Sequence, residues 1–112
     1  RNIKMSIKKI INQNPKINVI VSNADKKTYG YDMSNFISCK PPKITAVSEN
    51  GAGDIMTGTY IYYKSKKYKM SSALSLAVAA GTLYAKSKVT KINLDYNLIK
   101  KINKNIIQKS EK

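Results

Sequence analysis

The chain has 112 residues, a length that suits one small domain rather than two. Lys and Arg number 21 against 6 Asp and Glu, so the formal net charge is +15, while 42% of the residues are hydrophobic, enough for a core. Histidine is absent and Cys39 is the single cysteine. This composition excludes an internal disulfide, the usual histidine-containing zinc sites, and Ser-His or Cys-His nucleophile pairs.

The positive charge suggests a nucleic acid or another anionic surface as a partner, but composition offers a second explanation. Lys occurs 20 times, Ile 15 times and Asn 11 times, whereas Arg occurs once. These three abundant residues share A/T-rich codons, and arginine is the residue that reads phosphate and guanine bidentately. We therefore expect no specific nucleic-acid binding.

No apolar run approaches the about 18–20 residues that cross a bilayer. Residues 1–14 alternate Lys with Ile and lack the apolar centre of a signal peptide. We therefore expect no membrane segment and a cytoplasmic location. The chain begins with Arg1 rather than Met, which is consistent with a piece of something longer.

The first half of the chain predicts a helix followed by short strands. Isoleucines at helical spacing indicate an amphipathic helix over residues 3–12, which Asn14-Pro15 ends. Short β-branched or aromatic runs then predict strands at 17–21, 28–31, 36–39 and 44–47.

The second half predicts a glycine-bearing loop over residues 49–53 and then helices. The first helix begins at Asp54 and runs to about Lys67, and the second runs from a Ser71-Ser72 cap to about Lys86. The second is apolar nearly all round, which predicts burial on every side and more protein than this chain supplies. We expect it, and an unpaired strand at 17–21, to be exposed in the isolated chain. A lysine-rich helix with a fraying end, containing Leu98, Ile99, Ile102 and Ile106, is expected within residues 92–112.

The loop Gly51-Ala52-Gly53-Asp54 is the motif in this sequence that indicates a chemical function. It follows a predicted strand and opens a helix, a context in which backbone N–H groups and the helix dipole can hold a phosphoryl group. We expect both glycines to let the backbone turn tightly. Asp54, in the first helical turn, can accept a proton from an attacking hydroxyl. On the tetrapeptide alone, an ordinary turn with Asp54 as a helix-start residue is the favoured interpretation, because short glycine motifs often match by chance.

The residues around this loop resemble the C-terminal signature of the ribokinase-like (PfkB) carbohydrate kinase family. The resemblance covers roughly residues 17–88 and rests on the loop, Gly58 one turn later, the interhelix segment 70–74 and the Ala-rich run 77–83. It implies the C-terminal part of an α/β ribokinase-like fold: few strands, the Gly-Ala-Gly-Asp loop and two packed helices, in an incomplete domain. Residues 1–112 would be a C-terminal fragment of the kinase domain, most similar to the family over 44–88, with 89–112 a basic helical tail.

The same resemblance implies transfer of the ATP γ-phosphate, with Mg²⁺, to a hydroxyl of a sugar or nucleoside. Asp54 would be the catalytic base, and Gly51, Ala52 and Gly53 would form the anion hole. Nucleotide-binding positions would be Ser22, Asn23, Ala80 and Leu83, and no residue of the chain would bind metal directly.

The sequence departs from the family in three places. Residues 22–27 lack the usual glycines after the nucleotide-side strand, Ser48-Glu49-Asn50 replace a common Asp-Thr-Thr, and Val78 stands where the Ala-rich helix often has an asparagine. The second change puts activation by a monovalent cation in doubt.

Three hypotheses follow. The chain is the catalytic-loop portion of a sugar or nucleoside kinase, or an inactive remnant or partner subunit of such a kinase, or a basic nucleic-acid-binding module. A separate N-terminal kinase segment is the partner that the first two hypotheses imply.

Overall fold

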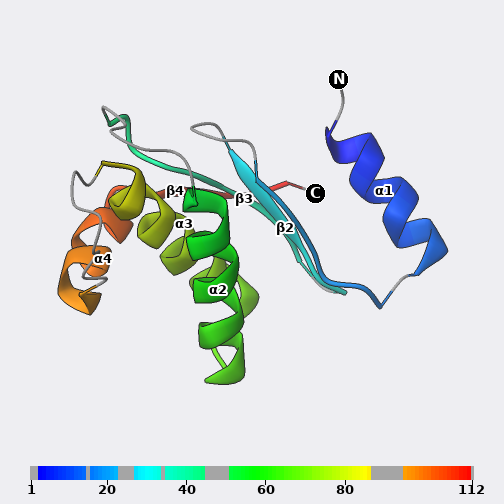
Figure 1. Cartoon of the computed structure of the whole chain (residues 1–112). Coiled ribbons are helices and arrows are strands. Elements are labelled where there is room, and N and C mark those ends of the chain that lie inside the picture. Colours follow the sequence, from blue (N-terminus) through cyan, green and yellow to red (C-terminus); the bar gives the residue numbers. More distant parts are fainter. Residues whose placement is uncertain are drawn as a thin grey trace.

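The computed structural model describes residues 3–14, 16–22, 27–33, 35–44, 51–86 and 95–111. These residues form four helices and four strands (Figure 1). In chain order the elements are α1 (Ile3–Gln13), β1 (Val19–Val21), β2 (Thr28–Tyr31), β3 (Phe36–Lys40), α2 (Ala52–Ser65), α3 (Met70–Lys86), α4 (Tyr96–Asn103) and β4 (Ile107–Ser110).

The strands form one antiparallel sheet in the order β1-β2-β3-β4. The first three are neighbours in the chain, whereas β4 returns after the three later helices to pair with β3. In this register Val19 lies opposite Tyr31, Thr28 opposite Cys39, and Ile37 opposite Ser110. The last pairing brings the two halves of the sequence into a single sheet.

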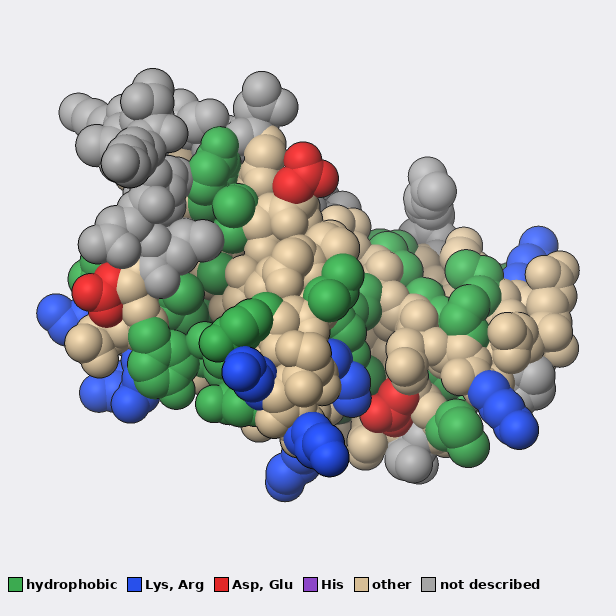
Figure 2. Space-filling view, turned by 60° about the horizontal axis from the view of Figure 1, so that its bottom comes forward, with side chains coloured by type: hydrophobic (Ala, Val, Ile, Leu, Met, Phe, Trp, Pro, Cys, Tyr) green, Lys and Arg blue, Asp and Glu red, His purple; other side chains and the backbone are tan. Residues whose placement is uncertain are grey.

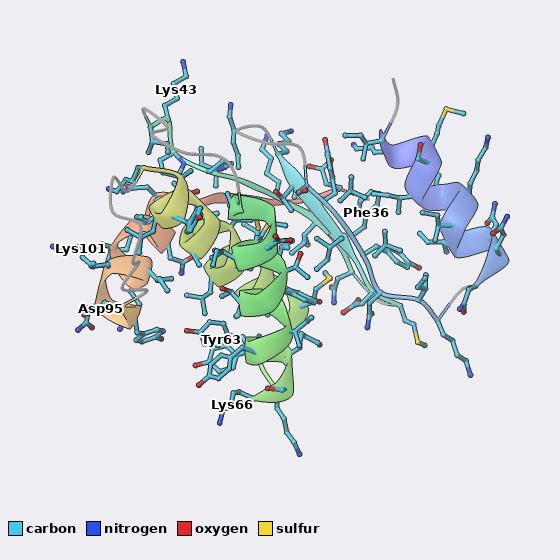
Figure 3. The ribbon with its side chains drawn as sticks, viewed as in Figure 1. Phe36, Lys43, Tyr63, Lys66, Asp95 and Lys101 are labelled. Atoms are coloured by element: carbon cyan, nitrogen blue, oxygen red, sulfur yellow. The ribbon has the colours of Figure 1, made fainter. Side chains whose placement is uncertain are left out.

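Helices cover both faces of the sheet, with α1 on one side and α2, α3 and α4 on the other (Figure 1). On the first face, Phe36 points toward α1 (Figure 3) and packs with Ile7 and Val19. On the second face, Ile37 and Cys39 pack against Leu74 of α3. Side chains alternate between the two faces along a strand, so both helical layers are packed against the same short strands.

Helix α3 is the centre of the fold. Twelve of its 17 residues are buried, and it packs against α2, α4, β2 and β3. The expectation that this helix needs cover from outside the chain is wrong for the described residues. Two later elements explain the difference: Ile99 and Ile102 of α4 bury one side of α3, and Gln108 of β4 donates a hydrogen bond to the Ser71 carbonyl at 2.9 Å.

Several predicted boundaries shift. Helix α1 and the strands at 28–31 and 36–39 lie where expected, but β1 is confined to Val19–Val21 and pairs with β2, so the expected unpaired strand is wrong. Residues 45–47 of the strand expected at 44–47 lie outside the described residues.

The end of the chain also differs from expectation. The predicted helix is present as α4 but ends at Asn103, so Ile106 lies beyond it, and the strand β4 was not predicted. All four β4 residues are exposed, so no alternation of buried and exposed residues marks the strand in the sequence. Its extended form follows from pairing with β3. Within the described residues, no helix is long and apolar enough to span a membrane.

Candidate active site

The glycine loop leads directly into α2, and Gly51 is the N-cap residue of that helix. Its φ of 94° places it in the left-handed region, and its carbonyl accepts the first helical hydrogen bond from the Ile55 N–H at 3.0 Å. No side chain of the described residues caps this end of the helix. The N–H groups of Ala52, Gly53 and Asp54 precede the first helical donor and meet no side-chain cap from the described residues, so they can bind an anion.

The two glycines of the loop have different roles, and the expectation that both allow a tight turn is wrong for Gly53. Helix α2 begins at Ala52 rather than Asp54, so Gly53 lies in the first helical turn. Gly51 is the one glycine with positive φ among the described residues. A Cβ added to Gly53 would have no heavy atom within 4 Å, so this position faces open space, as Gly58 also does.

Helix α3 fixes the position of this loop. A Cβ added to Gly81 would lie 3.3 Å from the Ala52 carbonyl oxygen and 3.5 Å from Met56 Cβ. Glycine at 81 thus permits the start of α2 to pack almost directly on the α3 backbone. Tyr84, one turn further along α3, lies beside Gly51. Sequence reasoning missed both residues, because the continuous apolar pattern of α3 gives no sign of which positions face the loop.

Asp54 is exposed in the first turn of α2, next to exposed Gly53. A carboxylate at a helix N-terminus interacts favourably with the helix dipole, and here it has direct access to solvent. The site therefore combines backbone N–H donors, open space and one accessible carboxylate. This combination can bind a phosphoryl group and accept a proton beside it.

The nucleotide-binding positions do not form one surface with the loop in the described residues. Ser22 is exposed directly after β1, and Asn23 lies outside the described residues. Ala80 and Leu83 are buried, in a cluster that includes Ile99 and Ile102. Burial gives these two side chains a packing role, and a nucleotide contact through any of the four residues stays a prediction.

Outside the loop, the described residues offer no second reactive site. Cys39 is fully buried, and burial raises the pKa of its thiol, although a hydrogen bond from Gln108 Nε2 at 3.4 Å acts in the opposite direction. It is therefore a core residue rather than a nucleophile. In the described part of the chain, no three Asp, Glu or Cys side chains gather as metal ligands.

On the face that Figure 2 shows, the described lysines are not gathered at one place. Basic side chains lie at the left, at the bottom and at the right of this view, separated by hydrophobic and uncharged surface. Two of them pack on rings: Lys66 Nζ lies 5.6 Å from the Tyr62 ring centroid, and Lys100 Nζ lies 5.3 Å from that of Tyr96. Tyr63 of α2 points toward α4, whose N-cap residue is Asp95 (Figure 3). The described lysines form no continuous basic groove on this face.

The family model described as pfkB family carbohydrate kinase matches residues 2–96. The chain belongs to this family, so the predicted resemblance is confirmed. No curated protein sequence matches the chain.

Solved structures show the same fold. A candidate phosphofructokinase from Staphylococcus aureus superposes with a TM-score of 0.83 at 20% identity, covering 99% of this chain and 36% of that one. Phosphofructokinase-2 from Escherichia coli, in complex with potassium, gives 0.80 at 24% identity, covering 92% and 33%. A candidate sugar kinase from Clostridium perfringens gives 0.80 at 16% identity, covering 99% and 36%. The chain therefore spans about a third of the length of the kinases it resembles, as part of their fold.

Proposed function

We propose that this chain supplies the phosphoryl-transfer site of a kinase that moves the γ-phosphate of ATP to a hydroxyl group of a sugar or nucleoside. Family membership supports the reaction class. The observation that carries the proposal is the start of α2, where uncapped N–H groups, the open space at Gly53 and the exposed Asp54 carboxylate adjoin one another.

In this reaction Asp54 acts as the general base. Its carboxylate accepts the proton of the acceptor hydroxyl as the acceptor oxygen forms a bond to the γ-phosphorus. The bond from that phosphorus to the oxygen bridging the β- and γ-phosphates breaks, and ADP leaves. The N–H groups at Ala52, Gly53 and Asp54, presented by the turn at Gly51, stabilise the negative charge of the transferring group.

In this proposal Mg²⁺ arrives with the nucleotide. Mg²⁺ is commonly bound through one or two carboxylates together with substrate phosphates and water. At the loop, Asp54 is the carboxylate that the described residues offer, and they contain no three-ligand cluster. When bound, Mg²⁺ would neutralise charge on the ATP phosphates. Whether a monovalent cation also takes part stays open, because Ser48-Glu49-Asn50 lie outside the described residues.

A second function within the same family is that of a partner subunit or an inactive remnant. The observation that favours it is coverage, since the similar kinases are about three times as long as the part that this chain matches. In that case a separate N-terminal kinase segment would supply the acceptor site. For either function we propose a cytoplasmic location.

Anion binding at the loop can be measured on the chain itself. We would titrate inorganic phosphate and then Mg-ATP into the labelled protein and follow backbone amide resonances by NMR. The amides of Ala52, Gly53 and Asp54 should shift together and saturate. Asp54→Asn is the matched variant: removing a negative charge beside the anion should tighten phosphate binding, whereas an adventitious ion on scattered lysines would bind both proteins alike. Shifts spread over lysine-rich segments, with none at 52–54, would overturn the proposal.

A further inference from the structure

Tyr84 of α3 lies directly against the turn that begins α2. A Cβ built on Gly51 would lie 3.0 Å from the Tyr84 hydroxyl oxygen, 3.4 Å from Cζ and 3.5 Å from Cε2. The ring is half-buried, so one part of it packs on the loop while another part remains accessible. The end of the tyrosine side chain therefore occupies the space that any side chain at position 51 would need.

Two independent constraints consequently act on position 51. The backbone at φ 94° is a conformation that residues with a Cβ rarely adopt. Contact with Tyr84 would separately force the ring or the loop to move, even for alanine. Glycine satisfies both constraints, and the tyrosine ring in turn limits how far the loop can move toward α3.

Ala52, the residue after Gly51, is also held in place by α3. Gly81 lies one turn before Tyr84 and permits the Ala52 carbonyl to approach the α3 backbone closely. The loop thus rests on α3 at two successive points, Gly51 on the Tyr84 ring and Ala52 on Gly81.

We propose that Tyr84 is a positioning residue for the phosphate-binding turn. Its ring supports the left-handed conformation of Gly51 and so holds the N–H groups of Ala52, Gly53 and Asp54 in the orientation that this turn sets. This inference rests on the proposed function of the loop, and it assigns to α3 a part in anion binding that requires no contact with the anion. Small errors in the orientation of such donors weaken binding, because each N–H group must point at the anion.

The test compares Tyr84→Ala with Tyr84→Phe and Tyr84→Leu. The first readout needs no ligand: the HN–Hα coupling constants of Gly51 and amide hydrogen exchange at residues 52–54. Tyr84→Ala should average the Gly51 couplings and speed exchange at the three amides by about tenfold, since removing the support permits local opening. Tyr84→Phe loses the hydroxyl oxygen nearest Gly51 but keeps the ring atoms behind it, so it should lie close to the wild type. Tyr84→Leu should fall between Tyr84→Phe and Tyr84→Ala.

The second readout is phosphate affinity, measured from the same amide shifts. Tyr84→Ala should weaken phosphate binding about tenfold, and Tyr84→Phe should change it less than about twofold. Tyr62→Ala, which removes an exposed tyrosine from the distal end of α2, is the matched control and should leave loop dynamics and phosphate affinity unchanged. If Tyr84→Ala lowers the melting temperature yet leaves the Gly51 couplings and the exchange at 52–54 unchanged, Tyr84 is only a packing residue. If the couplings change but the wild type binds no phosphate, the positioning role stands and the proposed function fails.

Discussion

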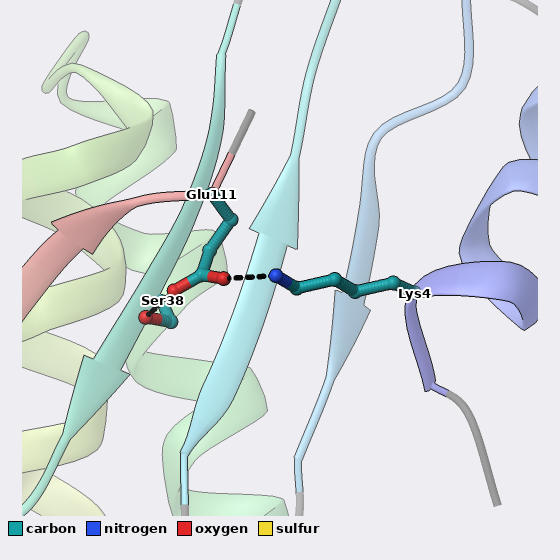
Figure 4. Close-up of polar contacts among 3 residues, drawn as sticks. All are labelled: Lys4, Ser38 and Glu111. Atoms are coloured by element: carbon teal, nitrogen blue, oxygen red, sulfur yellow. Dashed lines mark hydrogen bonds and ion pairs between the residues drawn. The ribbon is translucent and has the colours of Figure 1, made fainter.

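Lys4 Nζ of the first helix lies 2.7 Å from Glu111 Oε1, near the other end of the sequence (Figure 4). The same carboxylate accepts a hydrogen bond from the Ser38 hydroxyl at 2.6 Å, and the Glu111 N–H donates to the Phe36 carbonyl at 2.7 Å. The Glu111 side chain is only 8% exposed, whereas that of Lys4 is 47% exposed. The carboxylate therefore connects α1, β3 and the segment after β4 from a mostly buried position.

This arrangement predicts a specific loss of stability in acid. Hydrogen bonds from Lys4 and then Ser38 hold the pKa of Glu111 below its ordinary value of 4.5. A lowered folded-state pKa gives stability that is present above the unfolded pKa and lost as the pH falls through the folded pKa. The free energy of unfolding of the wild type should therefore fall more steeply below about pH 4.5 than that of Glu111→Gln. Parallel profiles from urea denaturation would contradict the assignment.

Stability at alkaline pH tests the contribution of Lys4, the ion-pair partner of Glu111. The hydrogen bond with Glu111 raises the pKa of Lys4 above 10.5, so its contribution is present below that pH and is lost as the pH rises through the folded-state pKa. Lys4→Gln should remove this alkaline loss and also reduce the acid-range difference between wild type and Glu111→Gln. Lys8→Gln is the control, because it changes another lysine of α1 for which no ion pair is described. It should leave the dependence of the free energy of unfolding on pH unchanged in both the acid and the alkaline range.

Burial of α3 within this chain predicts a large difference between two aliphatic truncations. Leu74 is 0% exposed, and Ile61 on α2 is 61% exposed. Leu74→Ala should lower the free energy of unfolding by about 2–5 kcal/mol, because it leaves a cavity between α3 and the sheet. Ile61→Ala should change it by less than about 0.5 kcal/mol. Equal effects in urea denaturation would mean that the α3 core is not formed in the isolated chain.

Three glycines near the loop should respond differently to alanine. Gly51→Ala should destabilise the fold by about 1–2 kcal/mol because of its positive φ, with a further loss from contact with Tyr84. Gly58→Ala should stabilise α2 by up to about 1 kcal/mol, because the position is helical and open.

Gly53→Ala should not destabilise the fold but should weaken phosphate binding, since it adds a methyl group between the proposed donors at Ala52 and Asp54. Thermal unfolding and phosphate titration of the three variants separate these roles, and Gly58→Ala is the control for helix propensity. Weaker phosphate binding in Gly58→Ala would contradict the location of the site.

Asp54→Asn tests the chemistry in an assembly that carries kinase activity, such as this chain together with a complementary kinase segment. General-base catalysis contributes about 10²–10⁴-fold, so kcat should fall by that order while ATP binding does not weaken. Asp54 is exposed, so folding should be nearly unaffected. Asp95→Asn is the matched control, since Asp95 also begins a helix but caps α4 through the Asn97 N–H at 2.7 Å. An unchanged kcat in Asp54→Asn would make Asp54 a helix-start residue without a catalytic role.

The sequence by itself determined the features that depend on local chemistry. Two glycines and an aspartate before a helix predicted the loop, and the apolar run of 73–85 predicted a buried helix. Short β-branched and aromatic runs predicted the strands β2 and β3, although not their pairing. In each case neighbouring residues carry the information, because backbone preference and side-chain periodicity act over a few residues.

The tertiary structure alone decided the features that depend on distant residues. The Ile107–Ser110 segment is a strand because the edge of β3 is available to it, although no residue of β4 is buried. The cover of α3 by α4 depends on the chain returning to it, which no local pattern reveals. The distinction between Gly51 and Gly53, and the place of Tyr84 beside the turn, depend on how two helices pack. Close approach of backbone and ring is a property of that packing, whereas sequence spacing records only that the residues are present.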